Sequence, residues 1–188
     1  MQKPLILSYK DKKPSINPSC FIAQNAVISG DVEIGEGSAI WYFCILRGDV
    51  SSIKIGKNTN IQDGTTIHVT RPNHLANKTG AEGGKAIIGN NVTVGHNCII
   101  HASTLRDNCF VGMGSILMDL SVMEEGSMLA AGSVLTPKTI VKSGELWGGV
   151  PARKMRDLKP EEVAYIQTSA DNYYTLAMEY KNECKEVE

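Results

Sequence analysis

A six-residue spacing of aliphatic side chains constrains the fold of this chain more than any other sequence feature. A helix requires a period of 3.6 and a half-buried strand a period of two, so neither accounts for it. A hexapeptide period is the signature of a parallel β-helix, in which three short strands make one coil and the aliphatic side chain points inward. The positions are Ile16, Ile22, Ile28, Ile34, Ile40 and Leu46, then Ile55, Ile61 and Ile67, then Ile88, Val94 and Ile100, and finally Leu105, Val111, Leu117, Met123, Leu129 and Leu135.

The repeat also sets the expected domain organisation. We expect residues 1–188 to form a single all-β domain, with the β-helix over 16–153 and a loop excursion at 70–85. Residues 158–186 read as an amphipathic α-helix packed outside the β-helix, and Pro160 followed by two glutamates marks its first turn. Small residues at 169–171 suggest an interruption of that helix.

Charge and cysteine content exclude several classes of function. With 19 basic and 20 acidic residues, the net charge of −1 argues against a nucleic-acid surface and a polybasic membrane patch. The apolar stretches are interrupted by charges and the first residues lack an apolar core, so we expect no membrane span and no signal peptide. The five cysteines form no CxxC pair, which predicts buried thiols and a reducing cytoplasm in place of a disulfide scaffold or a cysteine zinc site.

Two of the four histidines fall into register when the hexapeptides are grouped by threes. His68 and His101 follow inward aliphatic residues at the same position of successive coils, so they should stack on the outer surface. Two such imidazoles can share a metal ion. His96 lies around a corner from His101, and alternation does not settle its direction. It does not obviously join the pair within one chain, but a neighbouring subunit could supply it. His74 falls in the polar excursion and reads as a solvated loop residue.

A wider motif then resembles the γ-class carbonic anhydrases of the hexapeptide-repeat superfamily. It consists of Arg47-Gly48-Asp49, Asn60-Ile61-Gln62-Asp63, His68, Gly95-His96 and His101. The resemblance implies a left-handed β-helix and a homotrimer that binds Zn²⁺, or Fe²⁺ in some members. His68 and His101 of one chain and His96 of its neighbour would be the ligands. It also implies reversible hydration of CO₂ to bicarbonate by a metal-bound hydroxide at the subunit interface.

The resemblance assigns further roles around the metal. Gln62 would hydrogen-bond the metal-bound water or the substrate, and Arg47 and Asp49 would form a charged pair at the interface. Asp63 would fix the tautomer of His96, and Tyr173 would reach the site from the C-terminal helix. Simpler interpretations remain open: an ion pair that only orients subunits, two polar corner residues, and a tyrosine that only packs.

Three departures from the family pattern keep other functions in view. Val50 stands where the prototype archaeal enzymes have a glutamate, the excursion contains the single acid Glu82, and Ala102 replaces a usual glycine. A catalytically weak metal-binding homologue is therefore one alternative. An acyltransferase using acetyl-CoA is another, because residues 144–153 resemble the end of the β-helix in such enzymes. That chemistry needs one catalytic histidine and gives no reason for three.

Overall fold

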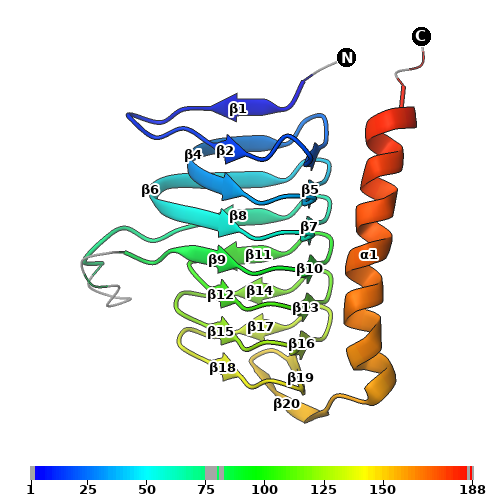
Figure 1. The fold of residues 1–188 in the computed structure, drawn as a ribbon. Helices are drawn as coiled ribbons and strands as arrows, with labels where there is room; N and C mark the ends of the chain where they lie inside the picture. The colour runs from blue at the N-terminus through cyan, green and yellow to red at the C-terminus, as the bar shows by residue number, and fades with distance from the viewer. Residues whose placement is uncertain (1–2, 75–79, 81–82, 186, 188) are drawn as a thin grey trace.

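The computed structural model is a parallel β-helix with one α-helix along its side, as the hexapeptide period predicts (Figure 1). It describes residues 3–74, 80, 83–185 and 187, so Glu82 lies outside the described residues. Successive coils wind in the left-handed sense and stack three rows of strands, which we call faces 1, 2 and 3.

Each face is a stack of strands that pair in parallel, except for the last pair of face 3, which is antiparallel. Face 1 contains β1 (Leu5–Leu7), the first parts of β4 (Val27–Ile34) and β6 (Ile45–Ile55), β8 (Thr66–His68), β11 (Ile99–His101), β14 (Ile116–Leu117) and β17 (Val134–Leu135). Face 2 contains β2 (Ser15–Ile16), the second parts of β4 and β6, β9 (Ala86–Ile88), β12 (Thr104–Leu105), β15 (Val122–Met123) and β18 (Ile140–Val141). Face 3 contains β3 (Phe21–Ile22), β5 (Ala39–Ile40), β7 (Asn60–Ile61), β10 (Thr93–Val94), β13 (Phe110–Val111), β16 (Met128–Leu129), β19 (Glu145–Gly149) and β20 (Ala152–Asp157).

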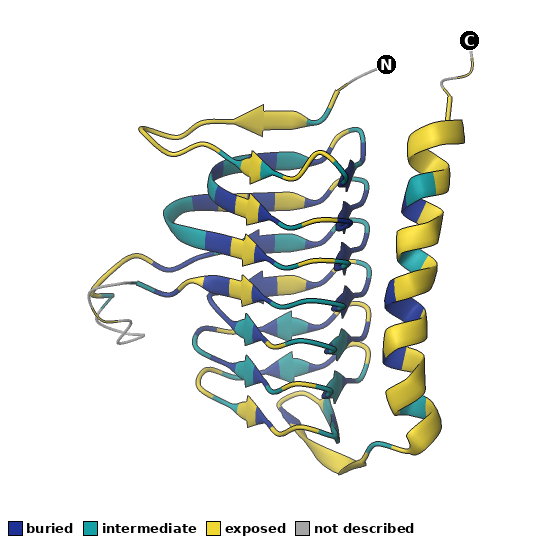
Figure 2. Ribbon diagram, viewed as in Figure 1, coloured by how far each residue is buried: buried dark blue, intermediate teal, exposed yellow. Residues whose placement is uncertain are grey.

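The aliphatic positions of the repeat form the core. Every one from Ile28 to Leu135 is buried, and only Ile16 and Ile22, in the first coil, are half-buried. Figure 2 shows the resulting alternation of buried and more accessible residues along the strands. Each fully buried Ile or Leu side chain contributes about 1.5–3 kcal/mol relative to an exposed one, so this column is the main source of stability.

An asparagine ladder follows one corner of the coils. Asn58 donates from Nδ2 to Asn91 Oδ1 at 3.1 Å, and Asn91 donates to Asn108 Oδ1 at 3.3 Å. Asn108 Nδ2 then donates to Glu125 Oε1 at 3.3 Å. All three asparagines have φ between +49° and +56°, a left-handed conformation that asparagine tolerates better than most residues.

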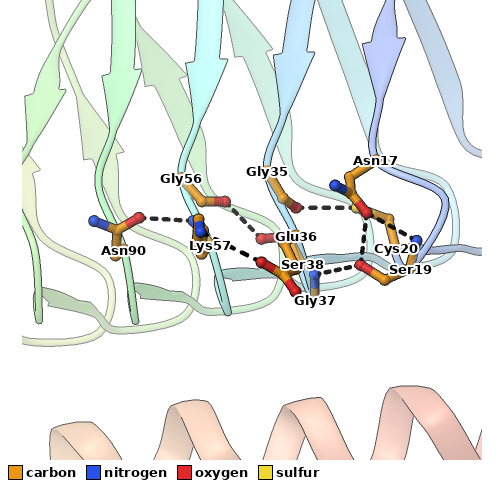
Figure 3. Close-up of polar contacts among 10 residues, drawn as sticks. All are labelled: Asn17, Ser19, Cys20, Gly35, Glu36, Gly37, Ser38, Gly56, Lys57 and Asn90. Carbon is orange, nitrogen blue, oxygen red and sulfur yellow. Dashed lines mark hydrogen bonds and ion pairs between the residues drawn. The ribbon is translucent and has the colours of Figure 1, made fainter.

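Contacts beside the ladder tie further coils together near α1 (Figure 3). Ser38 Oγ donates to the Gly56 carbonyl at 2.7 Å, and the Lys57 backbone N–H donates to Asn90 Oδ1 at 2.8 Å. Ser19 Oγ accepts from the Gly37 N–H at 2.9 Å in the coil before. These bonds satisfy backbone groups at corners, where the strand ladder is interrupted.

The two ends of the β-helix extend beyond the predicted range of 16–153. At the start, β1 pairs in parallel with β4, with Leu5 opposite Val27. Its three residues are exposed and do not follow the six-residue period, so the pattern could not reveal it. At the other end, β19 and β20 form an antiparallel pair that reaches Asp157.

The C-terminal helix α1 (Pro160–Glu183) lies along face 3 and is continuous, so the predicted interruption at 169–171 is wrong. Ser169 and Ala170 are buried because small side chains let the helix approach the sheet. Ser169 Oγ lies 3.1 Å from Thr93 Oγ1 of β10, which gives the buried hydroxyl a partner. Among the described residues, no helix is long and apolar enough to span a membrane.

Four cysteines are buried as predicted, but Cys184 is exposed because it follows the last turn of α1. Burial raises the pKa of the Cys44 thiol to about 12 and that of Cys109 to about 11. These two thiols therefore stay protonated at neutral pH, whereas a zinc ligand must be a thiolate.

Candidate metal centre

His68 and His101 lie directly one above the other on face 1, which confirms the predicted stacking. The parallel register pairs His101 of β11 with His68 of β8. His68 Nδ1 and His101 Nε2 are 3.2 Å apart, and the side chains are 20% and 35% exposed. Their inward neighbours, Ile67 and Ile100, are fully buried, and strand alternation therefore turns both imidazoles outward.

A carboxylate holds the other nitrogen of each ring. His68 Nε2 lies 3.0 Å from Asp49 Oδ1, and His101 Nδ1 lies 2.8 Å from Asp119 Oδ1. An ionised carboxylate only accepts hydrogen bonds, so these nitrogens carry the protons. In the neutral rings, the lone pairs of His68 Nδ1 and His101 Nε2 then face each other and repel unless a cation lies between them.

The distance between these two nitrogens fits a shared tetrahedral metal ion. Bonds of about 2.0–2.1 Å at a tetrahedral angle place two ligand nitrogens about 3.3–3.4 Å apart. The observed 3.2 Å is within a small adjustment of that spacing. The carboxylate on the far nitrogen of each ring is the usual arrangement around histidine ligands.

Arg47 and Asp49 form the predicted charged pair beside His68. Arg47 Nη1 contacts Asp49 Oδ2, and the Val50 N–H donates to Asp49 Oδ1 at 2.8 Å. Burial opposes ionisation of Asp49, but hydrogen bonds from His68 and Arg47 outweigh it and hold its pKa below the ordinary value. Burial is also the largest cause that lowers the pKa of His68, which favours the neutral imidazole that a metal requires.

A pocket of about 270 Å³ opens at the histidine pair. Val50, Thr70 and Arg71 line it together with His74. His74 lies in the loop as predicted, but it is half-buried and not fully solvated. The excursion folds back at its base, where Thr70 and Gly84 exchange two backbone hydrogen bonds of 2.9 and 2.8 Å, and this brings the loop beside face 1.

His96 belongs to a different part of the surface. Its side chain is 39% exposed and therefore points outward, and Nδ1 lies 2.9 Å from Asp63 Oδ2. Asp63 thus has the predicted contact with His96. No three metal-ligating side chains gather around one point in the part of the chain that the structure describes. As predicted, His96 does not join His68 and His101 within one chain.

Gln62 and Tyr173 lie on the same side of the molecule as His96. The Gln62 amide donates from Nε2 to Asn60 Oδ1 at 3.1 Å and is buried. Tyr173 packs edge-on against Trp41, with ring centroids 5.9 Å apart, and Gln62 is close enough to lower its pKa slightly. Burial and then the nearby Asp63 charge raise the pKa of Tyr173, so its phenol stays protonated.

The structure therefore sorts the predicted site residues into two groups. We call the first the paired half-site: Arg47, Asp49, His68 and His101, together with Asp119. We call the second the corner half-site: Gln62, Asp63, His96 and Tyr173.

Asp119 is the polar partner that sequence reasoning missed. It is buried and accepts hydrogen bonds from His101 and from the Thr70 hydroxyl. It lies just before Leu120, a corner residue with φ of +61°, where inward–outward alternation breaks. The sequence contained one indication of this contact, because Asp119 follows His101 by 18 residues, or about one coil.

Ala102 keeps the backbone conformation that a glycine would adopt. Its φ is +47°, in the left-handed region, and its side chain is buried. That conformation costs a residue with a Cβ about 1–2 kcal/mol, a cost that the surrounding coil overcomes. The substitution therefore leaves the path of the chain after His101 intact.

Comparisons with known proteins give one family-model match and many similar chains. A model of the hexapeptide repeat of succinyl-transferase matches residues 85–118. Gamma carbonic anhydrase 2, mitochondrial, from Arabidopsis thaliana is 47% identical over 178 residues, which are 95% of this chain. This chain spans only 62% of that plant protein. A carbonic anhydrase of Geobacillus kaustophilus is 36% identical, and the match covers 94% of this chain and 91% of the relative.

Two solved structures are similar over nearly the whole chain. A hexapeptide transferase family protein from Anaplasma phagocytophilum has a TM-score of 0.86 and 51% identity, covering 94% of this chain and 98% of the other. A putative acetyltransferase from Bacillus cereus has a TM-score of 0.87 and 35% identity, covering 95% and 97%. The similar proteins thus include carbonic anhydrases and a putative acetyltransferase.

Proposed function

Since the chain belongs to the γ-carbonic anhydrase-like family of hexapeptide-repeat proteins, we propose that it hydrates CO₂ reversibly to bicarbonate at a metal ion. The observation that carries the proposal is the pair of facing lone pairs on His68 and His101, 3.2 Å apart. Each of these rings is anchored by its own carboxylate. An acyltransferase has no use for such a pair, because one histidine suffices as its general base.

The metal would be held between chains of a homotrimer. His68 and His101 of one subunit and His96 of its neighbour would supply three nitrogens and leave a fourth position open. The half-exposed His96–Asp63 pair suits such a place, since a neighbouring chain would cover it. A bound Zn²⁺ or Fe²⁺ would supply hydroxide at neutral pH, because a protein-bound zinc ion lowers the pKa of its water to about 7.

The remaining residues would bind and orient the substrate. Gln62 uses Nε2 on Asn60, so its Oε1 is directed to accept a hydrogen bond from water or from bicarbonate. Arg47, half-exposed at the pocket, would attract the bicarbonate anion. Asp63 would hold the His96 tautomer, and the protonated Tyr173 would support Gln62 from the helix.

Metal analysis and stopped-flow CO₂ hydration test this proposal together. Protein purified without chelators should contain about one zinc or iron per chain, as a symmetric trimer with shared sites requires. Removing the His96 ligand by His96→Ala should lower the metal-dependent rate by more than the roughly 10–100-fold typical of losing an outer-shell partner. Equal rates of CO₂ hydration for wild type and His96→Ala would contradict the catalytic proposal.

Acyl transfer is the second candidate, because a similar solved structure is that of a putative acetyltransferase from Bacillus cereus. Calorimetry with coenzyme A and a metal-free preparation distinguishes it. An acyltransferase would bind coenzyme A without the metal, whereas the proposed hydratase would not. A protein that holds the metal but hydrates CO₂ no faster than buffer would be the catalytically weak homologue.

A further inference from the structure

One buried carboxylate of the paired half-site, Asp119, has no part in the substrate binding or metal ligation proposed above. Asp119 has a side chain only 11% exposed, at the corner after β14. Its Oδ1 accepts from His101 Nδ1 at 2.8 Å, and its Oδ2 accepts from the Thr70 hydroxyl. Burying a carboxylate costs several kcal/mol unless it is well paired, so its place against a histidine needs a reason.

The geometry shows what the carboxylate does to the ring. Because Asp119 accepts at Nδ1, the neutral His101 carries its proton there and its lone pair at Nε2. That lone pair faces His68 Nδ1 at 3.2 Å. Without Asp119, both tautomers of His101 would be accessible, and in one of them the nitrogen that faces His68 would carry a proton.

We propose that Asp119 is a positioning residue that fixes the tautomer and orientation of His101 toward the metal. The inference rests on the proposed function for the metal, but its effect on the ring exists in the metal-free protein. Asp49 does the same for His68 at the opposite nitrogen, so the two rings present Nδ1 and Nε2 respectively.

Thr70 extends the arrangement into the loop. Its hydroxyl binds Asp119, and its backbone exchanges hydrogen bonds with Gly84 at the base of the excursion. Thr70 is itself buried, so the hydroxyl has little freedom to turn to water. The base of the loop thereby holds the carboxylate against His101, and a Thr70→Val substitution should loosen it.

The test uses Asp119→Asn in the full-length protein, with Asp107→Asn as the matched control. Asp107 is also a corner aspartate, and it accepts hydrogen bonds from the backbone N–H and the side-chain amide of Asn90 at 2.8 and 3.0 Å. Long-range ¹H–¹⁵N NMR of metal-free protein reports the tautomer of His101. Competition with a chromophoric chelator reports the affinity for zinc.

We expect wild type and Asp107→Asn to hold His101 protonated at Nδ1 and to bind zinc equally. Asp119→Asn should mix the tautomers and bind zinc about 10–100-fold more weakly, the usual effect of losing such a partner. Thr70→Val should act in the same direction and less strongly, while Thr70→Ser should resemble wild type. If Asp119→Asn does not fold, the difference between Thr70→Val and Thr70→Ser still tests the proposal.

Two results separate the failures. An Asp119→Asn protein with an unchanged tautomer and unchanged zinc affinity would overturn the role of Asp119. A wild-type protein that binds no metal would overturn the proposed function, and the tautomer measurement would still decide for or against Asp119.

Discussion

The two half-sites differ in how much of their structure one chain provides. In the paired half-site, His68 and His101 are stacked by strand register, and each is held by a buried or half-buried carboxylate. In the corner half-site, His96 and Asp63 contact each other, but both are about 40% exposed. A single chain thus orders the paired half-site more fully than the corner half-site, as the proposed sharing of the site between subunits requires.

Mixed trimers of two inactive variants test the difference between the half-sites, and they should give the largest effect. His101→Ala removes the paired half-site and His96→Ala removes the corner half-site, so each protein alone should lose CO₂ hydration. Co-expressed with different tags, the two chains should regain about one quarter of wild-type activity, because one interface in four combines two intact halves. A mixture that stays inactive would mean that both halves act within one chain.

Core packing behind the paired half-site carries the next largest effect. Ile100 is fully buried directly before His101, so Ile100→Ala should lower the free energy of unfolding by about 2–5 kcal/mol. Ile140→Ala, at a side chain 45% exposed on face 2, should cost far less. Chemical denaturation measures the free energy of unfolding of both variants. Similar losses would contradict the conclusion that the inward aliphatic column is the main source of stability.

Gly48 tests how tightly the backbone of the paired half-site is packed. A Cβ at Gly48 would lie 2.4 Å from the Asp31 carbonyl oxygen, so Gly48→Ala must shift the backbone between Arg47 and Asp49 or that of Asp31. We expect a loss of about 1–3 kcal/mol and weaker zinc binding.

Gly126→Ala is the control for Gly48→Ala. It costs about 1–2 kcal/mol through its left-handed backbone, with φ of +66° and no atom within 4 Å of the added Cβ. It should leave zinc affinity unchanged, so equal zinc affinities for both variants would contradict the role of Gly48.

The smallest effect concerns the helix that carries Tyr173. Arg156 binds both oxygens of Glu162 at 2.6 and 2.7 Å and, with the Lys159 N–H, lowers the pKa of Glu162 from 4.5 to about 2. As the pH falls, Glu162 is protonated in the unfolded chain near pH 4.5, well before it is protonated in the folded chain. The stabilisation is therefore present above about pH 4.5 and is lost as the pH falls toward 2.

Glu162→Gln should therefore flatten the acid limb of the stability curve followed by circular dichroism. The pair is exposed, so its contribution is small and falls with salt. An acid limb identical to that of wild type would show that the pair does not anchor the helix.

The sequence predicted best what the repeat itself controls. Register placed His68 on His101 and Asp63 beside His96, because coil spacing converts sequence distance into vertical neighbours. Prediction from the sequence failed for the elements that do not follow the six-residue period. β1 joins by edge pairing without the period, and the continuity of α1 depends on how closely Ala170 fits against face 3.

The same limit applies to the site. Asp119 lies at a corner, where alternation does not tell which way a side chain points. His74 is placed by the folding back of the excursion, a contact between segments that composition cannot show. Roles that depend on a neighbouring chain, such as the metal ligand His96, stay predictions.

The asparagine ladder gives the β-helix a direction. Each amide passes a hydrogen bond toward the C-terminus, and Glu125 ends the series because a carboxylate has no N–H to donate further. At the other end, the side-chain oxygen Oδ1 of Asn58 is buried and accepts no hydrogen bond. An engineered coil inserted between Asn91 and Asn108, with its own corner asparagine, would therefore continue the chain of amides, whereas one added after Glu125 would meet a terminus that accepts only.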